Sequence, residues 1–472
     1  MNVLRPLLLS VLVLSGCSAV GPDYHRPADA VFTRDAAQAP FAGTNDTPAV
    51  APKPLPAHWW RLYNDPTLDA LIERALTANT DLRVAAANLD RAQAALEAVQ
   101  AQAEPTVGVT GGPTFGHVSG VQALQPDARP KSRWSYSGGV SVAYQVDLFG
   151  QIQRAIEAST QDAATAQAAL DATRVTVAAE TARAYADACA SGMQIDSAQN
   201  SVDVQRRSLD VTSRLQQAGR GTALDVTRAR SQLQQLQANI PPLVAQRRTA
   251  LYRLATLTGD VPTAFPKALA QCDKPPVLAQ PIPVGDGAAL LQRRPDIRQA
   301  ESALAAATAR IGVATADLYP KISLGLSAAS GGPVNLLGER GTFSWSLGPL
   351  ISWTIPNTGA AQARIAQSEA DTRAAYAKFD GAVLGALRET ESALAVYAQQ
   401  LDRNQALEAA RDESREAASQ ARRVFQAGKA DFLTVLDAER TLAGTESALA
   451  ASQAALTGNQ IALFLALGGG WE

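Results

Sequence analysis

The sequence has few aromatic residues, only three histidines and only three cysteines. Aromatic residues make up 5% of its 472 residues although hydrophobic residues make up 46%. Most apolar positions therefore hold alanine and leucine, which is typical of long packed helices. The histidines (His25, His58 and His117) are scattered, which argues against a metal cluster. The formal net charge of −2 gives no broad basic surface, so we expect no nucleic-acid partner.

Motifs for chemistry are missing as well. We find no nucleophile elbow, phosphate-binding loop, Cys-X-X-Cys pair or histidine–carboxylate metal spacing. The sequence therefore predicts a protein that is not an enzyme and that holds no cofactor. Energy for any transport must come from another protein.

The amino terminus has the pattern of a secretory signal. Arg5 precedes the apolar run Leu7 to Leu14, which is too short to span a bilayer as a helix. The following Leu-Ser-Gly-Cys17 resembles the lipobox of bacterial lipoproteins, which implies a signal peptide over residues 1–16 and an N-acyl and S-diacylglycerol lipid on Cys17. The alternative is an ordinary signal peptide with a stray cysteine nearby. Ser18 stands where many inner-membrane lipoproteins have aspartate, so the expected location is the outer membrane.

The two remaining cysteines lie far apart in the sequence. Cys189 falls in a helical pattern and Cys272 in a proline-rich segment. We expect two free thiols rather than a bridge between them, although the compartment would permit one.

Two long segments alternate apolar and polar residues. In Trp134–Phe149 the even-numbered positions are mostly apolar and the odd-numbered positions mostly polar. Thr342–Ile355 also alternates, with its apolar residues mostly at odd-numbered positions. Successive side chains of a strand point to opposite faces. Each segment therefore predicts a strand with one apolar face, longer than the usual five to six residues.

Long helices fill most of the remaining sequence. Residues 151–218 and 359–427 contain no proline, and each would be roughly 100 Å long as one helix. Such helices need a packing partner along their whole length. Gly219 and Gly428 predict turns, after which helices return to about residues 257 and 467, the first interrupted at Pro241-Pro242.

The second half of the sequence repeats the first. A shift of 209 residues pairs Gly219 with Gly428, Leu224 with Leu433 and Gly150 with Gly359. One shift that holds through a strand, a turn and a helix indicates an internal duplication. We therefore expect an extended, lipidated arm over residues 17–61, a first repeat over 62–284 and a second repeat over 285–472.

Strands and helices together favour a membrane channel. Transmembrane strands take about 9–11 residues and carry aromatic residues at the membrane interfaces. The aromatic positions near the strand ends are Trp134, Tyr136, Tyr144, Phe343, Trp345 and Trp353. Shorter alternating segments at Val107–Val109 and Ile322–Leu326 are each expected to form a hairpin with one of the long strands, so one chain supplies about four strands. Four are too few for the smallest barrel of eight, so copies must share a barrel of 8, 12 or 16 strands. The predicted fold is mainly α with a membrane β-barrel.

Motifs along nearly the whole mature chain resemble one family. They are Cys17 with Gly21-Pro22-Asp23-Tyr24 and Pro27, Trp59-Trp60, Asp65-Pro66, Arg293-Arg294-Pro295-Asp296-Ile297 with Glu301, Ile311-Gly312 with Ala314, Tyr319-Pro320 and the terminal segment from Ala466 to Trp471. The chain is similar to the TolC-like outer-membrane factors, in particular the NodT-type lipoproteins that work with RND efflux pumps. The resemblance implies a homotrimer in which long antiparallel helical hairpins form an α-barrel in the periplasm and four strands per chain form a shared 12-stranded β-barrel. It also implies a periplasmic adaptor and an inner-membrane RND pump as partners, and passive conduction of small toxic compounds.

The resemblance assigns roles to two groups of residues. Leu433 and Asp437 correspond to the periplasmic constriction, and Arg228, at the repeat-equivalent position of Asp437, is a candidate partner for its carboxylate. A surface aspartate and an ordinary core leucine are the alternative. The adaptor is expected at the two turns, formed by Gly219 with Arg220 and Gly428 with Lys429. The two basic residues depart from the family pattern.

A structural or adhesive lipoprotein with coiled hairpins and no transport role is the alternative function. The alternation of the strands argues against it, because a spacer needs no polar lumen.

Overall fold

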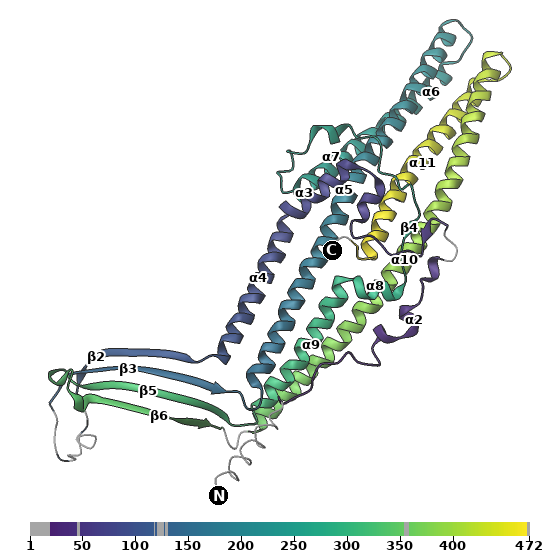
Figure 1. The fold of residues 1–472 in the computed structure, drawn as a ribbon. Coiled ribbons are helices and arrows are strands. Elements are labelled where there is room, and N and C mark those ends of the chain that lie inside the picture. Colours follow the sequence, from purple (N-terminus) through teal and green to yellow (C-terminus); the bar gives the residue numbers. More distant parts are fainter. Residues whose placement is uncertain are drawn as a thin grey trace. The chain divides into compact units, whose positions relative to one another are not determined.

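The computed structural model describes residues 19–44, 48–117, 119, 127, 131–353 and 358–469. Cys17 lies outside these residues. The chain forms two compact units (Figure 1). The first consists of Met1–Arg26, Leu89–Thr165 and Ala300–Phe379, and the second of Pro27–Asn88, Ala166–Gln299 and Asp380–Glu472.

The long elements follow the same order in both halves of the sequence. The first half contains α3 (Pro66–Ala78), α4 (Thr80–Gln100), β2 (Thr106–Gly116), β3 (Arg133–Val146), α5 (Gln151–Gln217), α6 (Ala223–Ala238) and α7 (Ile240–Leu257). The second half contains α8 (Gly287–Arg293), α9 (Pro295–Ala316), β5 (Lys321–Pro333), β6 (Phe343–Ser352), α10 (Thr358–Gln426) and α11 (Phe432–Ala466). This order is what a duplication predicts. The boundaries proposed for the arm and the two repeats stay predictions.

The two longest helices, α5 and α10, end within one residue of their predicted ends. Neither contains proline, and both are rich in alanine, which has the highest helix propensity. The predicted interruption near Pro241-Pro242 is confirmed. There α6 ends at Ala238 and α7 begins at Ile240, with the prolines in the first turn of α7, where the missing N–H groups have no helical acceptor.

The first unit contains a four-stranded antiparallel sheet with the order β2-β3-β5-β6. The register joins Val109 to Val140, Val140 to Ala328 and Ala328 to Trp345 across the four strands. Strand β3 ends at Val146, three residues before the predicted end at Phe149. The reason is local: the Asp147 carboxylate accepts a hydrogen bond from the Gln153 N–H at 2.8 Å, and Gly150 turns the chain into α5 with φ of 73°.

The segment that follows the predicted lipid-carrying residue is bound within the same unit. The buried Arg154 guanidinium donates to the carbonyl oxygens of Val20 (3.1 Å) and Gly21 (3.2 Å) and to the Asp23 carboxylate (2.6 Å). Arg26 forms a two-pronged ion pair with Glu301 at 2.8 and 2.9 Å. Residues 20–26 are therefore held by side chains of α5 and α9.

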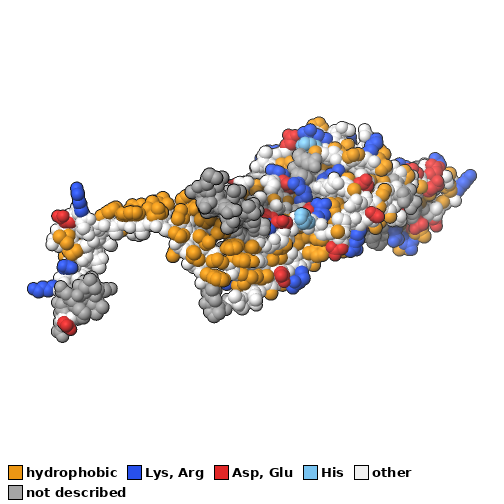
Figure 2. Space-filling model, turned by 60° about the horizontal axis from the view of Figure 1, so that its bottom comes forward, with side chains coloured by type: hydrophobic (Ala, Val, Ile, Leu, Met, Phe, Trp, Pro, Cys, Tyr) orange, Lys and Arg blue, Asp and Glu red, His pale blue; other side chains and the backbone are white. Residues whose placement is uncertain are grey.

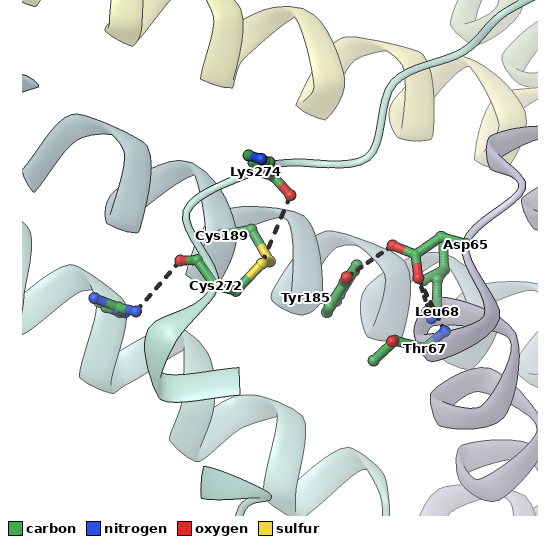
Figure 3. The surroundings of a disulfide bond; sticks show 8 residues. Asp65, Thr67, Leu68, Tyr185, Cys189, Cys272 and Lys274 are labelled. Carbon is green, nitrogen blue, oxygen red and sulfur yellow. Dashed lines mark hydrogen bonds between the residues drawn. A yellow bond between two sulfur atoms is a disulfide. The ribbon is translucent and has the colours of Figure 1, made fainter. Parts of the chain in front are cut away.

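The second unit has an aromatic core. Trp59 is fully buried and stacks on Phe464 of α11 with ring centroids 4.5 Å apart, and Tyr63 packs against both rings. Asp65 caps α3 by accepting from the Leu68 N–H, and its second carboxylate oxygen accepts from the Tyr185 hydroxyl of α5 at 2.7 Å (Figure 3). These contacts fix the start of α3 against α5 and α11.

Our expectation of free thiols was wrong, because Cys189 and Cys272 form a disulfide (Figure 3). The bond joins α5 to the segment after α7. Gly192 permits this close approach, since a Cβ there would overlap the Cys272 carbonyl group. The one clue in the sequence was the expected oxidising compartment, with two cysteines left after the predicted lipid site.

The arm is less extended than predicted. Residues 31–61 contain the short helix α2 (Asp35–Gln38), the two-residue strand β1 (Val50–Ala51), which pairs in parallel with β4 (Ile282–Pro283), and 3-10 turns. The Glu391 carboxylate of α10 accepts from the N–H groups of Ala42 (2.8 Å) and Gly43 (3.1 Å). Because α10 supplies these acceptors, the local sequence of the arm did not reveal the turns.

Candidate functional site: an amphipathic sheet and the ends of two helical hairpins

The sheet carries exposed apolar side chains on one face. The register places Val109, Val140 and Trp345 on this face, with exposed fractions of 77%, 46% and 69%. The other exposed members are Val107, Phe115, Trp134, Tyr144, Leu324, Leu326, Phe343, Leu347 and Ile351. Figure 2 shows the hydrophobic side chains gathered along the strands. Nothing in the described part of the chain covers this face.

The opposite face is small and polar. Its strand positions hold mainly serine, threonine and glycine: Thr106, Thr110, Thr114, Ser135, Ser137, Ser141, Ser323, Ser327, Ser344, Ser346 and Ser352 with Gly108, Gly112, Gly139, Gly325 and Gly348. Ser327 and Ser346 share a hydrogen bond of 2.8 Å across β5 and β6. Charged residues stand only at strand ends, Arg133 and Lys321, and Leu350 is the one large apolar exception. The face can therefore line a wet passage without strong charge.

The predicted aromatic residues fall at both ends of the strands. Trp134, Tyr136, Phe343 and Trp345 lie at the end where β3 and β6 begin, while Tyr144 and Trp353 lie at the other end. The Tyr136 hydroxyl contacts Ser330 and Thr342 at 3.0 Å. Trp134 and Tyr144 are ten residues apart, about 34 Å along a strand, which projects to about 26 Å at a tilt of about 40°. That height matches the apolar band of roughly 25 Å in outer-membrane strands.

Neither outer strand of the sheet is paired on both sides. In the described ranges, β2 pairs only with β3 and β6 only with β5. Each therefore presents a row of free backbone N–H and C=O groups over ten or more residues. None of the described helices is long and apolar enough to cross a membrane.

The two predicted turns have the same backbone structure. Gly219 and Gly428 adopt φ of 72° and 68°. The next residue closes the turn in each case: the Arg220 N–H donates to Leu215 O at 2.8 Å and the Lys429 N–H to Val424 O at 3.0 Å. This is the Schellman motif, in which glycine tolerates the left-handed conformation. Arg220 and Lys429 are exposed at the ends of the two hairpins.

The three candidate gate residues line one groove. Leu433 and Asp437 of α11 and Arg228 of α6 border a depression of about 320 Å³ with Gln232 and Arg440. Leu433 is 47% exposed. Within the described chain, no ion pair of 4.0 Å or less joins Arg228 to Asp437. Leu436 also borders the groove and is buried together with Ala229 and Phe432, which gives the groove an apolar side.

The structure adds one residue that the sequence analysis missed, Glu439. Its side chain is 6% exposed, and its Oε1 atom lies 3.8 Å from Arg422 of α10. Burial raises the pKa of this carboxyl group. A glutamate in a helix of mixed polarity gives no sequence signal of burial, because its neighbours come from other helices.

Comparison with known proteins identifies the family. A family model described as outer membrane efflux protein matches residues 71–260 and 288–469. The chain belongs to this family. It is 30% identical over 476 residues to the toluene efflux pump outer membrane protein TtgC of Pseudomonas putida, covering 99% of this chain and 96% of the relative. It is 28% identical over 462 residues to nodulation protein T of Rhizobium leguminosarum bv. trifolii, covering 98% and 96%.

A solved structure has the same fold over almost the whole length. The outer-membrane channel OprN aligns with a TM-score of 0.87 and 35% identity, covering 96% of this chain and 99% of that chain. The predicted family resemblance is confirmed, and so is the mainly helical fold with long hairpins and four long strands. The protein is an efflux channel of the outer membrane. The roles of the gate, tip and aromatic residues remain predictions.

Proposed function

We propose that three copies of this chain close one twelve-stranded barrel in the outer membrane and continue as a helical tunnel in the periplasm. The observation that carries the proposal is the sheet, with an exposed apolar face, a small polar face and two unpaired edges. In lipid every backbone polar group must be satisfied, so an open edge must pair with another strand. The free edges of β2 and β6 are therefore expected to pair with those of neighbouring copies.

The number of copies follows from strand count and family. Four strands per chain give 8, 12 or 16 strands for two, three or four copies, and eight is the smallest number that closes. The resemblance to trimeric TolC-like channels favours three. The polar faces then line the lumen and the apolar faces contact lipid.

The channel is proposed to be the passive part of a tripartite pump. An inner-membrane RND pump supplies the energy, and a periplasmic adaptor contacts the two turns at Arg220 and Lys429. The name of the relative TtgC, a toluene efflux pump outer membrane protein, supports small toxic compounds as the transported class. We infer no catalytic step in this chain.

The amino terminus is proposed to carry the lipid. Cys17 would be acylated, which adds a second membrane anchor beside the strands. The binding of residues 20–23 by Arg154 supports this, because it holds the chain just after the proposed lipid site to the same unit as the sheet.

Leu433 and Asp437 are proposed to form the periplasmic constriction. In three copies they give a ring of leucines one helical turn from a ring of carboxylates. Carboxylates brought close together repel unless they are hydrated, paired or protonated. Arg228 and Arg440, which border the same groove, are the candidates for pairing.

Planar-bilayer recording of the purified protein tests the proposal. We expect discrete conductance steps from material that migrates as a trimer in detergent. The matched control is the variant Val140→Arg, which places a charge in the middle of the apolar face and should prevent insertion. A protein that stays monomeric, or that inserts and passes no ions, would contradict the proposed function.

A further inference from the structure

Helices α10 and α11 are linked by two arginine–glutamate pairs one heptad apart. Arg415 and Glu446 lie 3.1 Å apart, and Arg422 and Glu439 lie 3.8 Å apart. In both pairs the arginine belongs to α10 and the glutamate to α11. They differ in burial, since the Glu446 side chain is 24% exposed and the Glu439 side chain only 6%.

The buried carboxylate of Glu439 is incompletely satisfied. In the described part of the chain, Glu439 Oε2 is buried without a hydrogen-bond partner. On α5, the Ser208 hydroxyl faces the carboxylate. The cations that face it are Arg422 on α10 and Arg207 on α5, while Asp437 and Arg440 are its charged neighbours along α11. A buried carboxylate with one free oxygen disfavours its ionised form.

Glu439 lies where the two helical hairpins meet. Ser208 belongs to the hairpin of α5 and α6, whereas Arg422 and Glu439 belong to the hairpin of α10 and α11. Close by, Ala229 of α6 is buried together with Phe432 and Leu436 of α11. Glu439 is also only two residues from Asp437, so a change in how it packs acts on the segment that holds the proposed constriction.

We propose that Glu439 is a positioning residue of the gate, which holds α11 against α5 when it is protonated and weakens that contact when it is ionised. This inference rests on the proposed constriction at Leu433 and Asp437. It identifies a residue that acts on the gate without lining the groove.

The sign of the pH dependence follows from the burial. Because burial raises the pKa of Glu439 in the packed state, the packed state binds the proton more tightly than a state in which α11 has moved away. The extra stability of the packed state is fully present below the pKa of the released state and is lost as pH rises through the pKa of the packed state. Each unit of difference between the two pKa values changes the equilibrium about tenfold.

Spin-label distances between the two hairpin ends test this directly. Cysteines are placed at the exposed positions Ala218 and Ala427, and the native Cys189 and Cys272 do not take up label because they form a disulfide. Labelled chains are diluted with unlabelled chains so that distances within one copy dominate. We compare wild type, Glu439→Gln and the matched control Glu446→Gln from mildly acidic to mildly alkaline pH.

We expect the distances in wild type and in Glu446→Gln to lengthen and broaden as pH rises. In Glu439→Gln, which is isosteric and always neutral, they should stay short at every pH. The released population should then be several-fold lower than in wild type at the highest pH. A Glu439→Gln protein that titrates like wild type would overturn the proposal.

Conductance separates this inference from the proposed function. If the channel conducts but Glu439→Gln has the same pH dependence of open probability as wild type, Glu439 does not act on the gate. If none of the three proteins conducts while the distances respond as expected, the proposed conduction fails, and the effect of Glu439 on hairpin packing stands on the distances alone.

Discussion

At the scale of single residues, Leu433 and Asp437 are the positions where side chains should control conduction. Leu433 is half exposed and borders the same groove as Asp437, so its side chain is available to a neighbouring copy. We expect Leu433→Ala with Asp437→Ala to raise single-channel conductance or open time several-fold, because both rings then lose the side chains that narrow the opening.

The repeat supplies a control for this double variant. Leu224 of α6 is the repeat equivalent of Leu433 and is 55% exposed, yet the family resemblance gives it no place in the constriction. Leu224→Ala should leave conductance unchanged. Equal conductance of the double variant and wild type in planar bilayers would remove the assignment.

The parts of the candidate site that depend on a single residue could be predicted from the sequence. Glycine at a helix end predicts a left-handed turn by itself, and both Gly219 and Gly428 adopt that conformation. Glu439 is different. Its burial depends on Ser208 and Arg422, which lie on two other helices, and no local pattern around Glu439 contains that information.

At the scale of elements, adjacent residues of β3 should respond in opposite ways to the same substitution. Val140 is on the apolar face near the middle of the strand, and Ser141 is on the polar face. An arginine on the lipid side at mid-membrane costs about 2–4 kcal/mol. Val140→Arg should therefore prevent insertion and assembly, whereas Ser141→Arg should assemble and shift ion selectivity toward anions.

Heat-resistant oligomer on a gel and reversal potentials in a salt gradient measure the two outcomes. If Val140→Arg assembled normally while Ser141→Arg did not, the assignment of the faces would be reversed.

The disulfide is the second element-scale feature with a measurable effect. It closes a separation of 83 residues between α5 and the segment after α7, for which the chain-entropy estimate is about 4.5 kcal/mol. Reduction should lower the melting temperature followed by helical circular dichroism. The variant Cys189→Ser with Cys272→Ser should melt at the lower temperature with or without reductant. Two reactive thiols in the unreduced wild-type protein would contradict the bond.

The sequence predicted elements better than it predicted contacts. The absence of proline over almost seventy residues was enough to place the ends of α5 and α10. The end of β3 was missed because it depends on Asp147 reaching forward to the first turn of α5, and the disulfide was missed because its partners are far apart in the sequence. Hydrophobic periodicity shows which face of a segment is buried, but it does not show which distant segment packs against that face.

At the scale of the whole molecule, the number of copies determines how many strands the closed barrel contains, because each sheet has two free edges. When tagged and untagged chains assemble at random into a closed ring, each ring contains between zero and all tagged subunits. The number of different masses is therefore one more than the number of subunits. Barrels of 8, 12 and 16 strands therefore give three, four and five mixed species from four strands per chain.

Co-expression of tagged and untagged chains, followed by native mass spectrometry in detergent, counts these species without any assumption about shape. We expect four peaks, in proportions close to a binomial distribution, because cyclic closure makes every interface between β2 and β6 equivalent. Five peaks would mean sixteen strands and a wider lumen than three copies allow, and three peaks would leave only eight strands, a number whose interior side chains fill. An eight-stranded barrel has too little interior volume to pass small toxic compounds. The mixing experiment therefore tests both the number of copies and the proposed conduction through the lumen.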